Sequence, residues 1–222
     1  MAKQVIILPF KNKFLSDIDK CSRIYNKCAK LTAVRNSEKI HPKQLARITE
    51  MTFIDLVSAW EIFLENIFLR YLLGAKCPND SDPNRFITHI KKLKEARGLL
   101  SGLENYDAEK QYMRFIDTKW VIDRSKYFFK DGKPFADLQP HINKFVAATK
   151  IRNAIAHNSP KSKKDFLDTA KNTFNIKNQG LHPGELLNKY ATVQFNLGRA
   201  TKKTYYEAYS ELYKSMAEVL AP

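Results

Sequence analysis

The sequence predicts an all-α fold, and three segments support this prediction. Residues 11–34 and about 200–220 place apolar side chains three and four positions apart, a spacing typical of amphipathic helices. Residues 43–73 are apolar on nearly all sides, which predicts a central helix packed against several neighbours. Hydrophobic residues make up 44% of the chain, enough for a sizeable core.

Helix breakers divide the first half of the chain. His41-Pro42 separates the first two helices, and Pro42 suits a helix start. Gly74 is a plausible stop for the central helix. Trp60 lies within that helix, where core packing is favoured over stacking on a nucleic-acid base.

The middle of the chain is less regular. A weak helix is expected over Ile87–Leu100, whose lysines and Arg97 either face RNA or form a solvated face. Residues 108–135 predict a further helix and then a small loop or hairpin excursion. The hairpin is expected at Asp131-Gly132, because Asp-Gly favours a type I′ turn. Later helices are expected over 137–157 and 163–173.

Charge gives the first indication of function. The 222 residues include 38 lysines and arginines against 23 aspartates and glutamates, a net charge of +15. Such a chain attracts polyanions, namely RNA, DNA or an anionic membrane surface, and we favour nucleic acid. Solubility or a basic proteome is the alternative explanation.

Several common chemistries and locations are not expected. No apolar run approaches the roughly 20 residues that a membrane span needs, and the start lacks a signal-peptide core. Three cysteines agree with a reducing compartment, so we expect a cytoplasmic protein with no membrane partner. The glycines build no GxGxxG, GxxxxGK[ST] or GxSxG motif. Without CxxC, HExxH or metal-ligand spacing among the histidines, we expect no cofactor and no metal site.

Arg152, Asn153 and His157 form the strongest candidate for chemistry. At about 100° per residue, His157 points away from the apolar face of its helix, and Asn153 shares its side one turn earlier. Arg152 lies one position off this stripe, but its side chain is long enough to curl toward it. A guanidinium binds phosphate oxygens, an amide orients a hydroxyl or a phosphate oxygen, and a histidine exchanges protons near neutral pH. The set therefore suits a phosphodiester.

RNA supplies its own nucleophile, the 2′-hydroxyl, so such a site does not require a metal. Two copies of the helix side by side in a dimer would put two histidines and two arginines around one phosphate. One histidine would then act as base and the other as acid. The alternative is that Arg152 and His157 are ordinary solvated residues of a surface helix.

Three stretches together resemble the HEPN superfamily, all-helical ribonucleases and nucleic-acid- or nucleotide-associated domains. The first is Arg152-Asn153-x-x-x-His157, similar to the Arg-x(4–6)-His signature of that superfamily, whose nuclease members typically carry a polar residue after the arginine. The second, Ser58-Ala-Trp60-Glu61-Ile-Phe-Leu-Glu65, looks like the central helix of prokaryotic members, especially the RiboL-PSP-HEPN-like group. The third, Gly180-Leu-His-Pro-Gly184-Glu-Leu-Leu187, looks like the loop before that group's late helix.

The resemblance implies a HEPN-like up-and-down helical bundle, a single domain over residues 1–222 with an insertion or variable region at 75–135. It implies a homodimer formed through the helix at 141–157. The implied activity is metal-independent endonucleolytic cleavage of RNA that leaves 2′,3′-cyclic phosphate and 5′-hydroxyl ends. The implied setting is a toxin–antitoxin system or antiphage defence, with RNA and an antitoxin protein as partners. Related toxins carry a tyrosine two positions after the histidine, where this chain has Ser159.

Roles follow from this resemblance as hypotheses. His157 acts as general base or acid, Arg152 binds the scissile phosphate, and Asn153 orients the substrate or the histidine. Glu61 or Glu65 holds Arg152 in place, with Glu61 favoured, or forms a purely structural salt bridge. Candidate RNA-binding lysines, which are alternatively a solvated basic face, are Lys150, Lys161, Lys163 and Lys164.

Two other interpretations stay open. The chain is either a non-catalytic HEPN module that binds or senses RNA or nucleotides, or a helical interaction protein. In the second case the signature helix is only a dimer contact.

Overall fold

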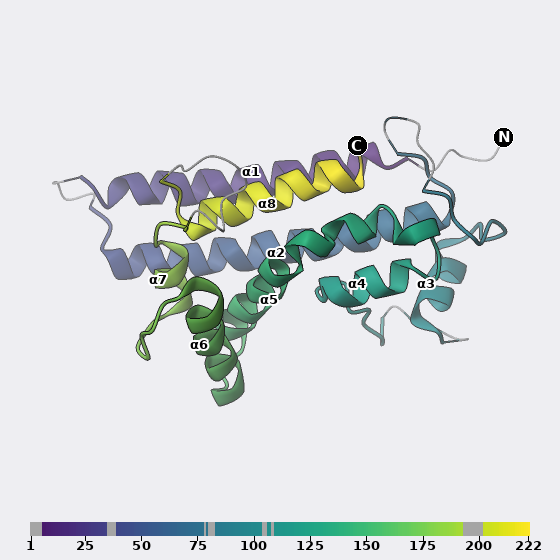
Figure 1. Cartoon of the computed structure of the whole chain (residues 1–222). Coiled ribbons are helices and arrows are strands. Elements are labelled where there is room, and N and C mark those ends of the chain that lie inside the picture. The colour runs from purple at the N-terminus through teal and green to yellow at the C-terminus, as the bar shows by residue number, and fades with distance from the viewer. Residues whose placement is uncertain are drawn as a thin grey trace. The chain divides into compact units, whose positions relative to one another are not determined.

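The computed structural model describes residues 6–34, 39–77, 79, 83–103, 106–107, 109–192 and 202–222. In this part of the chain it contains eight α-helices and two short 3-10 helices (Figure 1). The described residues form no β-strand, only the isolated bridges Arg85–Phe129 and Tyr190–Thr204. The predicted all-α fold is therefore confirmed.

The chain divides into two compact units. The first unit comprises Met1–Leu15, Trp60–Ile142 and Met216–Pro222, and the second comprises Ser16–Ala59 and Asn143–Ser215. Three helices are divided between the units: α1 (Leu8–Leu31), α2 (Pro42–Leu72) and α8 (Tyr205–Leu220); of α5 (Ile142–Ala156), only Ile142 belongs to the first unit. The single domain over residues 1–222 stays a prediction. No described helix is long and apolar enough to cross a lipid bilayer.

Phenylalanine rings form the core of the first unit. The Phe68 ring of α2 stacks on Phe135, with centroids 4.6 Å apart, and meets Phe129 edge-on at 5.3 Å. Phe115 and Phe128 also lie edge-on to Phe68, at 6.0 and 6.1 Å. All five rings are buried. Burial of each such side chain contributes roughly 1.5–3 kcal/mol, which explains why the irregular segment 113–135 folds onto α2.

The excursion at 127–135 contains the predicted turn but no hairpin. Asp131 and Gly132 both have positive φ, 56° and 69°, as a type I′ turn requires. These two residues lie within the 3-10 helix η1 (Lys130–Gly132), and a second 3-10 helix, η2 (Phe135–His141), follows. Phe128 pairs instead with Phe86, whose N–H donates to the Phe128 carbonyl at 2.9 Å. Burial of the phenylalanine rings in the core is thus favoured over the hydrogen bonds of a hairpin within residues 127–135.

The remaining helices of the first unit are α3 (Leu93–Ser101) and α4 (Thr118–Ser125), both shorter than the sequence predicts. The central helix α2 ends as predicted: Gly74 adopts φ 87°, and the Ala75 N–H donates to the Arg70 carbonyl at 2.9 Å. Trp60 is 2% exposed and packs against Phe14 and Phe63, so its predicted core role is confirmed.

The second unit holds α5 (Ile142–Ala156), α6 (Pro160–Phe174) and α7 (Pro183–Leu187) beside its shares of α1, α2 and α8. Its core includes five buried tyrosines. Tyr25 of α1 stacks on Tyr206 of α8 with centroids 4.2 Å apart, and Tyr209 meets Phe53 of α2 edge-on at 5.3 Å. The apolar stripe predicted for the last helix is therefore confirmed as buried surface.

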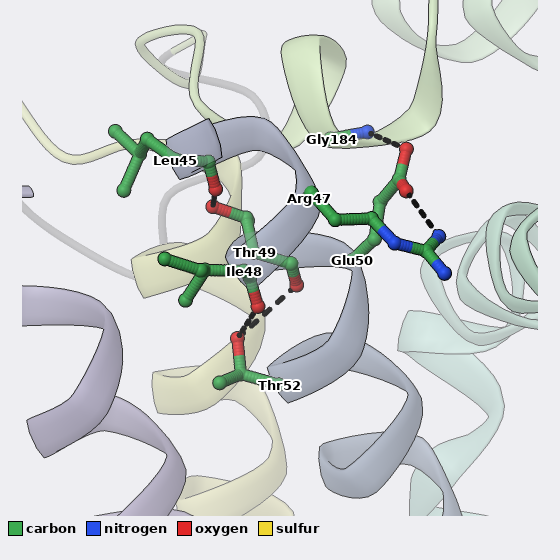
Figure 2. Close-up of polar contacts among 7 residues, drawn as sticks. All are labelled: Leu45, Arg47, Ile48, Thr49, Glu50, Thr52 and Gly184. Carbon is green, nitrogen blue, oxygen red and sulfur yellow. Dashed lines mark hydrogen bonds and ion pairs between the residues drawn. The ribbon is translucent and has the colours of Figure 1, made fainter. Parts of the chain in front are cut away.

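At Gly184 the backbone at the start of α7 lies close to the backbone of α2 in the second unit. A Cβ at this position would lie 2.1 Å from the carbonyl oxygen of Ala46, so only glycine fits. The Gly184 N–H donates to Glu50 Oε1 at 3.1 Å, and the other Glu50 oxygen pairs with Arg47 Nη1 at 3.1 Å (Figure 2). The predicted loop at 180–184 thus anchors the start of α7 to α2.

The helix predicted over 137–157 is divided in the structure. Residues 135–141 form η2, and the α-helix α5 begins only at Ile142. Pro140 explains the late start, because it has no N–H to donate and its ring clashes with a preceding α-helical turn. At the other end α5 stops at Ala156, so His157 is the first residue beyond the helix.

Candidate functional site

The end of α5 and the start of α6 carry the predicted signature, and both lie in the second unit. Arg152 and Asn153 occupy the last turn of α5 and are half-buried, whereas His157 is exposed. The apolar side of α5 packs inward, with Ala148 and Ile151 buried as predicted. Arg152 and Asn153 thus lie at the predicted end of the helix, whereas His157 lies just beyond it.

The backbone of His157 is fixed although its side chain is exposed. Its N–H donates to the Asn153 carbonyl at 2.8 Å, which extends the helical pattern by one residue. Its carbonyl accepts from the Ser159 N–H at 2.6 Å and from the Ser162 hydroxyl. These bonds fix the point at which the His157 side chain leaves the backbone.

Two serines provide this anchoring, and sequence reasoning missed them. The Ser159 hydroxyl accepts from the Ser162 N–H at 3.1 Å and caps α6, with Pro160 as the first helical residue. A capping serine directly before proline is a readable signal for a helix start, so it also predicts a helix that begins at 160 rather than at 163.

The Arg152 guanidinium lacks a carboxylate partner within its unit. Its Nη1 donates to Asn153 Oδ1 at 3.3 Å, the one side-chain contact that links two members of the signature. Its Nε is buried without a hydrogen-bond partner among the described residues. No aspartate or glutamate among the described residues of the second unit forms an ion pair with it. The positive charge is thus uncompensated there, which favours an anionic ligand.

The predicted supporting carboxylates lie in the first unit. Glu65 pairs with Arg97 of α3, with 3.2 Å between carboxylate oxygen and guanidinium nitrogen. The pairing gives Glu65 a structural partner and shows Arg97 to be engaged in the protein rather than free for RNA. The support of Arg152 by Glu61 stays a prediction.

The four predicted RNA-binding lysines surround the signature in the sequence and differ in exposure. Lys150 is half-buried on α5, while Lys161, Lys163 and Lys164 are exposed in the first turns of α6. None of the four forms an ion pair with a described residue, so their charges are available to a ligand.

A groove extends from two of these lysines along α6. It has a volume of about 810 Å³ and is lined by one face of α6 and by the residues after it: Pro160, Lys163, Lys164, Leu167, Asp168, Lys171, Ile176, Lys177, Asn178 and Gln179. Sequence reasoning missed its second half, Lys171 and residues 176–179. The spacing of Lys164 and Lys171 on one helix face was a readable signal, whereas the return of the chain after Asn175 was not.

The cysteines and possible metal ligands offer weaker candidates for a functional site. Burial, with Asp55 and Asp17 nearby, raises the pKa of the Cys21 thiol to about 11, so it is protonated and unreactive near neutral pH. Cys28, two helical turns further along α1, is half-buried. No group of three or more His, Cys, Asp or Glu side chains suited to a metal ion occurs among the described residues.

Comparisons of the chain with protein-family models, with curated proteins and with solved structures find no significant match.

Proposed function

We propose that this chain is a HEPN-type, metal-independent endoribonuclease that acts as a homodimer in the cytoplasm. The observation that carries the proposal is the Arg152 guanidinium, which contacts Asn153 and has no carboxylate partner among the described residues of its unit, one turn before a backbone-anchored and exposed His157. The strong positive charge of the chain supports RNA as the substrate.

The proposed chemistry uses the 2′-hydroxyl of the substrate. One His157 of the dimer takes the proton of this hydroxyl, and the 2′-oxygen attacks the adjacent phosphorus. The bond from phosphorus to the 5′-oxygen breaks, and the second His157, protonated, gives its proton to that oxygen. Arg152 neutralises the charge that develops on the phosphate, and Asn153 orients the guanidinium. The products are a 2′,3′-cyclic phosphate and a 5′-hydroxyl.

The uncovered side of α5 supports a dimer. Val146, Lys150, Asn153 and His157 follow one another at spacings of four, three and four, so they lie on one side of the helix. This side is exposed or half-buried, and Val146 is 38% exposed. In the proposal, two such sides from two copies meet and bring the signatures together.

The decisive experiment is RNA cleavage in excess EDTA. We expect the wild type to cleave, and His157→Ala and Arg152→Ala to lose about 10²–10⁴-fold in rate, the range of a general acid–base group. His89→Ala and Arg114→Ala are matched controls, since both side chains are exposed in the first unit. Equal rates for all five proteins, or activity that depends strictly on metal, would contradict the proposal.

A growth assay tests the proposed setting as a toxin or a defence effector with an antitoxin partner. Expression of the wild type is expected to slow host growth, and His157→Ala is expected to relieve this effect. Growth that is equally slow with both proteins would exclude RNA cleavage at this site as the cause.

The second candidate is a non-catalytic HEPN module that binds RNA or nucleotides. It is favoured by the His157 imidazole, which forms no hydrogen bond with a described residue and so has no group that fixes its tautomer. This candidate predicts salt-dependent RNA binding that His157→Ala leaves unchanged, without cleavage by the wild type.

A further inference from the structure

One face of α6 lines most of the groove. Positions 160, 163, 164, 167, 168 and 171 repeat at helical spacing and face the same side. This face extends about 17 Å from Pro160 to Lys171 at 1.5 Å per residue, long enough to contact several nucleotides.

The chain returns along this face after α6 ends. Asn175 adopts a left-handed conformation, φ 54°, and the Ile176 N–H donates to the Ala170 carbonyl at 2.9 Å. This reversal brings residues 176–179 to the groove, where Lys177 adds a fourth ammonium group to those of Lys163, Lys164 and Lys171. Asn178 is held there by its Oδ1, which accepts from the Gly180 N–H at 2.9 Å.

The four lysines of the groove have no ion-pair partner among the described residues. Asp168, the one carboxylate in the lining, stands four residues from Lys164 and three from Lys171 and pairs with neither. Like charges gathered without partners repel one another and disfavour the free folded state. A polyanion bound in the groove removes this repulsion.

The groove also offers contacts for bases. Leu167 and Ile176 are half-buried and present apolar surface between the lysines, and the exposed amides of Asn178 and Gln179 offer donors and acceptors. Duplex nucleic acid turns its bases inward, whereas a single strand can present bases to an apolar floor and phosphates to the lysines.

We propose that the α6 groove binds single-stranded RNA that flanks the cleavage site. Phosphates contact Lys163, Lys164, Lys171 and Lys177, and bases contact Leu167 and Ile176. Because Pro160 at one end of the groove follows His157 by three residues, the strand leads to the signature. The choice of RNA over DNA rests on the proposed function, while the groove and its charge do not.

The test measures binding of a fluorescein-labelled 20-nucleotide oligouridine by anisotropy between 50 and 300 mM salt. All proteins carry His157→Ala, which prevents cleavage. The groove variant is Lys171→Glu/Lys177→Glu. The control is Lys119→Glu/Lys130→Glu, which changes net charge equally at two exposed lysines of the first unit that have no ion pair among the described residues.

We expect the groove variant to bind at least tenfold more weakly at 100 mM salt and the control less than threefold more weakly. The slope of log affinity against log salt should fall by roughly 1.4 in the groove variant, at about 0.7 per lost phosphate contact of a single strand. Its melting temperature should not fall below that of the control, because repulsion within the groove is relieved.

Three results would overturn the proposal. Equal weakening of both variants would show that only the net charge matters. A 20-base-pair RNA duplex as sensitive to the groove variant as oligouridine would exclude single-strand recognition. If the His157→Ala protein binds phosphatidylserine vesicles but not oligouridine, and the groove variant weakens vesicle binding, the groove serves a membrane surface instead.

The same data separate this inference from the proposed nuclease activity. Weaker binding by the groove variant, together with no cleavage by the otherwise wild-type chain, keeps the groove and refutes the nuclease. If the chain cleaves RNA and the groove variant binds with unaltered affinity, the nuclease proposal stands and the groove proposal is refuted.

Discussion

The two units differ most in the balance of their charges. The first contains 17 lysines and arginines against 13 aspartates and glutamates, and the second contains 21 against 10. The second unit therefore carries +11 of the net +15, together with the signature and the groove. This uneven distribution of charge supports the proposal that a polyanion binds to the second unit.

Their cores differ as well. The first unit surrounds Phe68 with phenylalanines, and Tyr71 is its one buried tyrosine among the described residues. The second unit buries five tyrosines, Tyr25, Tyr205, Tyr206, Tyr209 and Tyr213. Buried hydroxyls need partners: Tyr25 bonds the Thr204 hydroxyl at 3.0 Å, and Tyr209 donates to the Lys144 carbonyl at 3.2 Å.

The largest expected effect is on the first unit. Phe68→Ala removes a fully buried ring from the phenylalanine cluster and should lower the free energy of unfolding by about 3–5 kcal/mol. Denaturant titration measures it, and Phe68→Leu, which keeps more of the volume, is the milder control. The folded fraction should bind oligouridine as tightly as wild type. An affinity loss like that of the groove variant would show that RNA binding is not confined to the second unit.

A smaller effect is expected at the close approach in the second unit. Gly184→Ala forces a Cβ against the Ala46 carbonyl and should cost about 1–3 kcal/mol, the range for overpacking. Thermal melting detects this loss. Gly180→Ala is the matched control, since its Cβ would lie 3.6 Å from the nearest atom, an ordinary contact. Similar melting temperatures for the two variants would mean that α7 is not held tightly on α2.

The smallest effect concerns alkaline pH. Burial raises the pKa of Tyr209 and Tyr213 above the usual value of about 10. Because the fold favours the neutral phenol, this stabilising contribution is complete below pH 10 and is lost as pH rises toward the folded-state pKa. Stability should therefore fall above about pH 10 as the unfolded chain releases its phenol protons first.

Tyr209→Phe isolates this contribution. The variant loses the hydrogen bond to the Lys144 carbonyl, about 1 kcal/mol at pH 7, but should lose less stability than wild type between pH 9 and 11. Urea unfolding at both pH values measures the difference. Tyr127→Phe, at an exposed residue of the first unit, should behave like wild type. Parallel losses in all three proteins would contradict the account of the tyrosine core.

Sequence periodicity predicts the long helices well because their apolar residues are local and regular. It places Arg152, Asn153 and His157 on one helix end for the same reason. Periodicity fails where residues distant in the sequence determine the structure. Phe128 and Phe129 pack on Phe68 instead of forming the predicted hairpin. The second half of the α6 groove likewise depends on a chain reversal at Asn175, a residue with no periodic signal.

Ion pairing distinguishes two arginines that the sequence does not separate. Arg97 and Arg152 both stand near lysines in predicted helices. Arg97 pairs with Glu65 across 32 positions of sequence, while Arg152 has no carboxylate partner within its unit. Periodicity predicts on which side of a helix a residue lies. It does not predict an ion-pair partner from a distant part of the sequence, which only the structure shows.

The most direct measurement is the chemical identity of the RNA ends after incubation in EDTA. We expect 2′,3′-cyclic phosphate and 5′-hydroxyl ends, and no cleavage when the nucleotide before the scissile phosphate is 2′-deoxy. Fragments with 5′-phosphate ends, or cleavage of the deoxy-substituted strand, would show that the 2′-hydroxyl is not the nucleophile and would contradict the roles given to Arg152 and His157.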